Sequence, residues 1–463
     1  MARQLADIFI NESTVKQIDT MRSDITKSNL DSFKEALADG TEKFFDLENS
    51  KKKAHLTKWK ATENLDRYLL DFEANFTRRG GKVIWANDAE EAREEIRRIL
   101  ANQETKAIVK TTSASCEEIG LFDFLHDKGF DPAETDTLAF IKRLFPKESS
   151  TWTFPPSLVN LSAIIQQFHE KFQTPIDSKP EQLIEKVNQL IREKLNQAEI
   201  GIAGVDFLIA DSGSIGLTEN EGNAMLLSSF SKIQIFIAGI DKIVPSVQDM
   251  DLFWPLLASY TNGQSPAVYN SILSGPRQAG EVDGPEAMYV ILLDNGRSNL
   301  LAKKEQRQGL YCIQCSACRY IYPVNSGGGT LMDDNVHPGP IGSMVAPHMN
   351  TTKDLSHLSF ASPLDGQASV ICPVRIEIDK MLLLNRKEAV EQNLVRKSEK
   401  RFWGGFAYLF LRRRLLDFFG HKTKNFLFQH LLKKSWGKER SLPRVAKKSF
   451  AQQWQDQEKK KNQ

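Results

Sequence analysis

The residues with the clearest chemistry are four cysteines. Cys312, Cys315 and Cys318 recur at an even spacing of three, and Cys372 lies far downstream, directly before a proline. Thiolates are soft, anionic ligands that suit iron–sulfur clusters. A single cysteine is usually a small buried hydrophobe, but three within seven residues are not typical of core packing. Structural zinc also takes four cysteines, usually as two C-x2-C pairs, so the three-plus-one grouping favours iron–sulfur.

The spacing is that of a bacterial two-cluster ferredoxin in which half of the motif is missing. In the run C-x2-C-x2-C-x3-C-P, three cysteines bind one cluster and the last binds the other. The first run and the crossing Cys372 supply four ligands for one cluster. The second cluster would need cysteines where the chain has Tyr322, Asp365 and Ala368. We therefore expect one [4Fe–4S] cluster per chain and no second cluster, and leave open whether Asp365 serves as an oxygen ligand in a residual site.

A polar loop follows an apolar strand candidate in the middle of the chain. It contains Glu219, Asn220, Glu221 and Asn223 within the segment 218–223. Loops at strand ends of open α/β sheets commonly hold ligands. Together with Lys110, Asp206 and Arg297, the loop could form a site for a small anion or hold an acid/base group. The alternative, which we favour, is a hydrogen-bonded turn with helix-capping side chains.

Composition and charge limit the functional classes. Assigning four of the five cysteines to metal leaves no disulfide framework, since only Cys116 remains, so a reducing compartment is expected. No signal-like stretch or membrane span is apparent. Residues 396–463 contain 19 Lys and Arg against 5 Asp and Glu, which gives this tail a charge of +14. Because the net charge of the whole chain is +2, residues 1–395 carry a charge of −12. This basic tail suggests an anionic partner, a membrane surface or the acidic body itself. Nucleic acid is not expected, because no recognised binding module accompanies the charge.

The elements that must position these residues alternate between strand and helix. We expect a charged helical region over 1–60 and a helix over 64–76 that places five apolar side chains on one face. A strand then precedes a helix opened by Asp88, whose side chain and acidic first turn suit an N-terminus. The apolar runs 233–244 and 287–294 read as buried strands. This alternation predicts an α/β fold with a largely parallel sheet.

A series of motifs in order resembles one known family over most of residues 60–395. The segments that carry the resemblance are R-G-G-K-V-I-W-A, V-K-T-T-S-A-S-C-E-E-I-G-L, G-V-D-F-L-I-A-D-S-G-S-I-G-L-T-E-N-E-G-N-A, I-A-G-I-D-K-I-V-P, L-L-D-N-G-R-S-N-L-L, H-P-G-P-I-G and I-C-P-V-R-I. They are similar to the iron–sulfur subunit of the bacterial L-lactate utilisation system, the lactate utilisation protein B family. The family pattern has cysteines for two clusters, from which this chain departs at the three positions named above.

The resemblance implies a CoA-transferase-like (ribose-phosphate isomerase-like) α/β domain and then a small helical ferredoxin-type module. We expect an N-terminal helical extension (1–60), the α/β lactate-utilisation domain (61–305), the 4Fe–4S module (306–395) and a basic helical tail (396–463). The implied role is electron transfer, with two other subunits, in the oxidation of L-lactate to pyruvate. The expected location is the cytoplasm, with peripheral contact to the inner membrane left open. Two alternatives remain, a structural assembly subunit with a redox-silent cluster and a small-acid-binding enzyme that uses the 218–223 loop.

Overall fold

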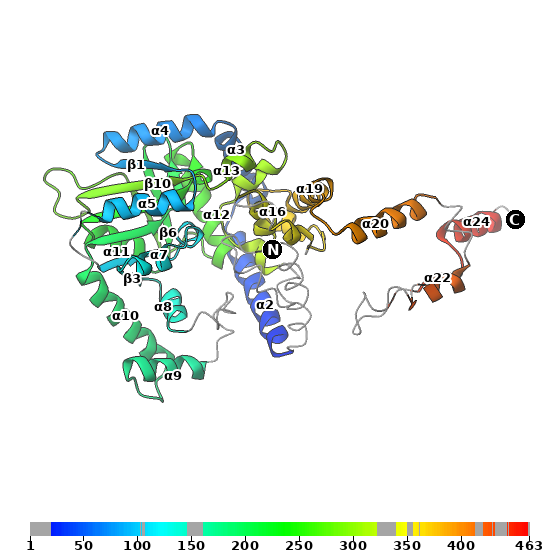
Figure 1. Ribbon diagram of the computed structural model, residues 1–463, viewed down its shortest axis with the longest axis horizontal. Helices are drawn as coiled ribbons and strands as arrows, with labels where there is room; N and C mark the ends of the chain where they lie inside the picture. Colours follow the sequence, from blue (N-terminus) through cyan, green and yellow to red (C-terminus); the bar gives the residue numbers. More distant parts are fainter. Residues whose placement is uncertain are drawn as a thin grey trace. The chain divides into compact units, whose positions relative to one another are not determined.

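The computed structural model describes most of the chain, in two units. The described residues are 20–101, 103, 107–145, 161–321, 339–349, 355–360, 362–412, 420–427, 429–430, 442 and 444–461. One unit comprises residues 1–388 and the other residues 389–463. Figure 1 shows the elements of both.

A six-stranded parallel sheet forms the centre of the first unit. Its strands, in spatial order, are β1 (Lys82–Ala86), β10 (Ala287–Leu293), β7 (Ile233–Gly239), β4 (Ile200–Gly204), β2 (Ala107–Lys110) and β3 (Asp131–Glu134). Every neighbouring pair is parallel. The α/β class and the parallel sheet expected from the sequence are therefore confirmed.

Helices cover both faces of this sheet, which explains why its strands are apolar throughout. Ile235 and Ile291 face a core shared with α5 (Ala89–Leu100), α6 (Ala114–Glu118) and α7 (Leu121–Asp127). The next residue of each strand, Phe236 and Leu292, faces the opposite core, shared with α4 (Leu65–Arg78) and α10 (Pro180–Gln197). Successive strand side chains alternate between faces, so a sheet buried on both sides needs continuous apolar runs.

Two helices confirm the local predictions in detail. The apolar face of α4 is buried as expected, through Leu65, Tyr68, Leu69, Phe72 and Phe76. Asp88 caps α5 by accepting hydrogen bonds from the backbone N–H groups of Glu90 and Glu91, each at 2.9 Å. Further along the chain, α6 and α7 are separate helices, with Gly120 in a left-handed conformation between them.

A second sheet, which the sequence did not predict, extends the α/β core. Its strand order is β8 (Ile243–Val244), β5 (Phe207–Ile209), β6 (Ser214–Glu219) and β9 (Tyr269–Leu273). The tight hairpin between β5 and β6 uses Gly213 at φ +59°, where an added Cβ would lie 2.3 Å from the Phe76 backbone nitrogen. A short 3-10 helix, η3 (Ile240–Lys242), joins β7 of the first sheet to β8 of the second.

The downstream helices pack with the N-terminal helices into a third core. This core includes Phe33, Ala54, Phe253, Met344 and Met381, together with three of the four cysteines. The elements concerned are α2 (Thr20–Glu42), α3 (Leu47–Glu63), α12 (Met250–Asn262), α13 (Arg297–Leu301), η5 (Gln306–Tyr311), α14 (Ala317–Tyr320), α16 (Gly339–Met349), η7 (Ser356–Phe360), α18 (Gln367–Ile371) and α19 (Ile378–Glu391).

The remaining elements lie at the edges of the first unit and in the second. In the first unit they are α8 (Thr137–Arg143), α9 (Leu161–Phe172), α11 (Asn223–Phe230) and η4 (Val247–Asp249). The second unit contains α20 (Lys397–Phe410), α22 (His421–Leu427) and α24 (Phe450–Lys461). Aromatic side chains are exposed on each of these three helices, among them Phe402, Trp403, Phe426 and Trp454. Within the described part of the chain, no helix has the length and apolar character needed to cross a membrane.

Candidate functional site

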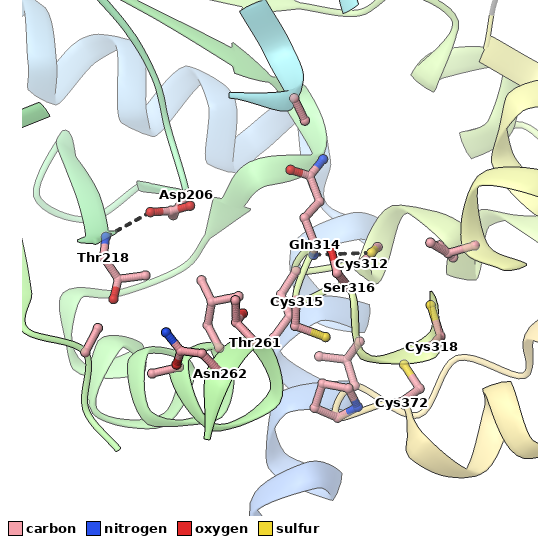
Figure 2. Close-up of a pocket in the computed structure, with 18 of the residues that line it drawn as sticks. Asp206, Thr218, Thr261, Asn262, Cys312, Gln314, Cys315, Ser316, Cys318 and Cys372 are labelled. Atoms are coloured by element: carbon pink, nitrogen blue, oxygen red, sulfur yellow. Dashed lines mark hydrogen bonds between the residues drawn. The ribbon is translucent and has the colours of Figure 1, made fainter. Parts of the chain in front are cut away.

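Folding brings the four predicted cysteines to one cavity. Cys312, Cys315, Cys318 and Cys372 all line a space of about 310 Å³, and Figure 2 shows the last three clustered below Cys312. Cys315, Cys318 and Cys372 are buried and Cys312 is partly buried. Besides Gln314 and Ser316, the wall near them is apolar and includes Ile313, Ile341, Pro373, Val374, Ile376 and Ile378.

Local backbone geometry turns the cysteine loop around the cavity. Gln314 and Ser316, which separate the cysteines, have left-handed φ values of +59° and +61°. The Gln314 N–H points to the Sγ atom of Cys312 at 3.3 Å, and the Ile376 N–H points to the Sγ atom of Cys372 at 3.4 Å. Backbone N–H groups directed at cysteine sulfur are among the features that set the potential of iron–sulfur clusters. They stabilise a thiolate more than a neutral thiol.

The four thiols interact with one another electrostatically. Burial raises the pKa of each thiol, to about 11 for Cys372. Each of the six pairs among them adds to this effect, because a thiolate at one cysteine disfavours a thiolate at the others. The free thiols therefore hold their protons at neutral pH. A cationic group bound among them would displace those protons, as metal binding to cysteine does in general.

The four thiols are the number of ligands that either a tetrahedral zinc ion or a four-iron cluster takes. Among the residues that the structure describes, no three His, Cys, Asp or Glu side chains are grouped closely enough to hold one ion. A tetrahedral zinc with bonds of about 2.3 Å would require its sulfur ligands within roughly 4 Å of one another. A four-iron cluster needs one thiolate at each of four iron atoms, and so a wider set around a larger space. The cavity has four thiols in its lining, one for each iron of such a cluster.

Two of the positions that a second cluster would use make other contacts. Asp365 is exposed and its carboxylate accepts a hydrogen bond of 3.2 Å from the Gln367 N–H at the start of α18. Ala368 is buried in the third core. Ser362 stands three residues before Asp365, at the first position of the second cysteine run, which the sequence reasoning missed. Its hydroxyl accepts a hydrogen bond of 3.1 Å from the Leu364 N–H. Tyr322 lies outside the described residues.

The polar loop predicted from the sequence opens onto the same cavity. Asp206, Thr218, Glu219 and Asn220 line it together with the cysteines (Figure 2 labels the first two). The Glu219 carboxylate accepts hydrogen bonds from the first backbone N–H groups of α11, at 2.9 and 3.1 Å. Asp206 accepts from the Thr218 N–H at 2.8 Å. These bonds agree with the capping interpretation that we favoured for the loop.

Two residues that the less favoured alternative grouped with this loop have other partners. Lys110 is fully buried and pairs with Glu134 at 2.8 Å. The Arg297 guanidinium is also buried and binds both oxygens of Glu118 at 2.8 Å, as well as Asp241. Both side chains are thus held by other partners, and the less favoured alternative of a ligand site at the loop loses its two cationic groups. Each charge is instead neutralised by carboxylates at the ends of the central strands, where burial requires a partner.

Two lysines that we did not single out lie beside the cysteines. The Nζ of Lys58, on α3, donates to the Asp241 carbonyl at 2.5 Å and the Ile243 carbonyl at 3.4 Å. The Nζ of Lys242, on η3, donates to the Gln314 side-chain oxygen at 2.6 Å. Burial lowers the pKa of Lys58 to about 8. The sequence signal for Lys58 was the helical spacing of charged residues along 47–63. This spacing predicts a shared face of α3 but does not show which part of the protein that face contacts.

Comparison with known proteins gives a consistent family. The sequence model of the LUD domain matches residues 69–293. Lactate utilization protein B of Bacillus subtilis is 37% identical over 331 residues, which cover 71% of this chain and 69% of that protein. Its counterpart in Geobacillus thermodenitrificans has the same identity and coverage. An uncharacterized electron transport protein of Escherichia coli is 35% identical over 345 residues, or 74% of this chain and 72% of that protein.

Among solved structures, similarity is weak. A DUF162 family protein from Deinococcus radiodurans has a TM-score of 0.29 and 17% identity, covering 50% of this chain and 98% of its own.

Proposed function

This chain belongs to the lactate utilization protein B family, and from that premise we propose that it is an iron–sulfur electron-transfer subunit. It works in a multi-subunit system that oxidises L-lactate to pyruvate. Its one [4Fe–4S] cluster is held by Cys312, Cys315, Cys318 and Cys372. The observation that supports this most is that four cysteines from two distant segments line one cavity.

The chain's own residues supply a setting suited to electron transfer. When bound, a [4Fe–4S] cluster accepts and releases single electrons. The apolar wall that includes Ile313, Ile341 and Ile376 limits access of water to the sulfurs. The backbone N–H groups of Gln314 and Ile376 are directed at two of the sulfurs. A dry shell and such hydrogen bonds tune the potential and stability of a cluster.

We propose that lactate itself is oxidised on a partner subunit. The polar wall of the cavity contains the carboxylates of Asp206 and Glu219. It also contains Thr261 and Asn262, the last two residues of α12, where the helix dipole is negative. A lactate anion is disfavoured by all of these. This weighs against the alternative of a small-acid-binding enzyme that uses the 218–223 loop.

The assembly alternative differs in one measurable property. A subunit whose cluster only holds the downstream helices in place needs the same four cysteines but no accessible redox change. Two partner subunits, a cytoplasmic location and the domain limits 61–305 and 306–395 belong to the same proposal. So does the role of the basic tail, residues 396–463, in contacting an anionic partner or surface.

Iron and acid-labile sulfide, measured on anaerobically purified protein, test the proposal. Cys318→Ser should lose most of both, whereas Cys116→Ser should keep them, since Cys116 lies in a different core. About four of each per chain, with one S = 1/2 EPR signal after dithionite reduction, are expected. About eight would mean that a second cluster forms without cysteine. The absence of iron, or zinc alone, would refute the electron-transfer role, and a cluster that no physiological reductant can reduce would favour assembly.

A further inference from the structure

One face of α3 lies against the segments that hold the cysteines. Glu48, Lys51, His55 and Lys58 follow one another at spacings of three or four, so they share a helix face. Glu48 binds Arg375, three residues after Cys372. The Lys51 Nζ donates to the Val370 carbonyl at 3.2 Å, and the His55 Nδ1 lies 2.9 Å from the Val374 carbonyl oxygen. Lys58 contacts η3, as described above.

Of the cations on this face, Lys58 is the one without a neutralising partner in contact. Lys51 lies 3.4 Å from Glu48. Both hydrogen bonds of the Lys58 ammonium go to backbone carbonyls, and among the described residues no carboxylate forms a salt bridge with it. The nearby Asp241 carboxylate is bound by Arg297. Lys58 is therefore a buried positive charge that forms no salt bridge among the described residues and that the Asp241 carboxylate balances only in part.

A second buried cation reaches the cysteine loop directly. Lys242 is 4% exposed, and its ammonium binds the side chain of Gln314, whose backbone N–H points to the Cys312 sulfur. Besides the other cysteines, the groups that act on Cys312 are the Gln314 N–H, Lys242 and Lys58, which favour its thiolate, and Asp241, which disfavours it. Burial raises the pKa of this thiol, and the charges of Lys242 and Lys58 act against that rise. Lys242 thus reaches Cys312 through Gln314, and Lys58 binds the backbone of the neighbouring residues Asp241 and Ile243, so both positive charges favour negative charge at Cys312.

We propose that Lys58 and Lys242 raise the reduction potential of the cluster, an inference that rests on the proposed function. A cluster held by four thiolates is anionic, and reduction by one electron adds a negative charge. Buried cations stabilise the reduced form more than the oxidised form, because charges interact strongly where solvent does not screen them. Lys58 acts through its charge alone, and Lys242 acts through its charge and through its bond to Gln314.

The test is a redox titration of the full chain, followed by EPR, after iron and sulfide have been measured. Lys58→Met and Lys242→Met remove the charge and keep a side chain of similar length. Each should lower the equilibrium constant for reduction at least tenfold, which corresponds to about 59 mV toward more negative potential for one electron. Lys58→Arg and Lys242→Arg should stay near the wild-type potential. Lys60→Met, an exposed position on the same helix, is the matched control.

The outcomes separate this inference from the proposed function. A wild-type protein without iron would refute the proposed function. A full iron content with unchanged potentials in both Met variants would overturn only the inference. If Lys58→Met loses its iron, Lys242→Met decides the question. If both Met variants lose it while the Arg variants keep it, the lysines serve to retain the cluster and the tuning role is rejected.

Discussion

The buried ion network around Arg297 offers a prediction whose size can be derived from the structure. Arg297 is 1% exposed and binds both oxygens of Glu118 at 2.8 Å, the carboxylate of Asp241 and the Asp294 carbonyl at 3.1 Å. Its partners come from α6 and η3, so the network connects the strand ends of the central sheet to the segment that carries Lys242. Arg297→Met keeps most of the side-chain volume and removes every one of these bonds.

The expected loss of stability is large because two carboxylates remain buried. Glu118 and Asp241 have side chains only 4% and 5% exposed, so water cannot replace the guanidinium without rearrangement. Removing one partner of a buried ion pair costs about 3–5 kcal/mol. We therefore expect Arg297→Met to lower the free energy of unfolding by about 4 kcal/mol.

Urea unfolding of the protein, compared through midpoints at a common slope, measures this loss. The matched control is Arg277→Met, because Arg277 binds Glu286 at the same 2.8 Å but both side chains are exposed. A solvated pair of this kind contributes about 0–1 kcal/mol. Equal losses in the two variants would refute the reasoning, because they would mean that burial of the carboxylates has no consequence.

The pH dependence of the variant provides a second check. Without Arg297, a buried carboxylate of Glu118 or Asp241 takes up a proton more readily in the folded than in the unfolded state. The folded variant then binds more protons, so its stability increases as pH falls. The difference from wild type should therefore shrink as the pH is lowered. Adding Glu118→Gln to the variant should restore part of the stability at the higher pH.

Three further predictions concern single residues. Burial raises the pKa of Cys116 to about 11, so about one thiol in a thousand is ionised at pH 8. Iodoacetamide should therefore label Cys116 only when urea unfolds the protein, as measured by peptide mass spectrometry. Labelling of the folded protein would contradict the burial of this thiol. Asp88→Ala should lower the free energy of unfolding, measured in urea, by about 1 kcal/mol. Asp88→Asn should lower it much less, because the asparagine oxygen can still cap α5. Equal losses in the two variants would contradict the role of the cap. Gly213→Ala should destabilise by at least about 2 kcal/mol more than Gly120→Ala. Both glycines have φ near +60°, but only at Gly213 would the added Cβ collide with backbone atoms. Similar urea midpoints for the two alanine variants would show that the hairpin can shift to make room.

The sequence determined those features that depend on near neighbours along the chain. The spacing of Cys312, Cys315 and Cys318 already indicates a shared ligand role, because residues so close in sequence cannot separate far in space. The buried face of α4 and the cap at Asp88 follow from helical periodicity and from the unsatisfied N–H groups of a first turn. The continuous apolar runs of β7 and β10 predict burial on both faces, and the parallel sheet follows from it.

Tertiary structure alone decided which distant groups meet. Lys110 and Arg297 follow strands just as the 218–223 loop does, yet buried carboxylates neutralise both, and only Asp206 joins the loop. Lys58 lies beside Cys312, 254 positions away, because α3 packs against the cysteine segments. A charged side chain looks the same in sequence whether it binds a ligand, balances a carboxylate or acts on a metal site. The difference lies in the groups that packing places around it, because both the strength of a charge interaction and the penalty for burying it depend on those neighbours.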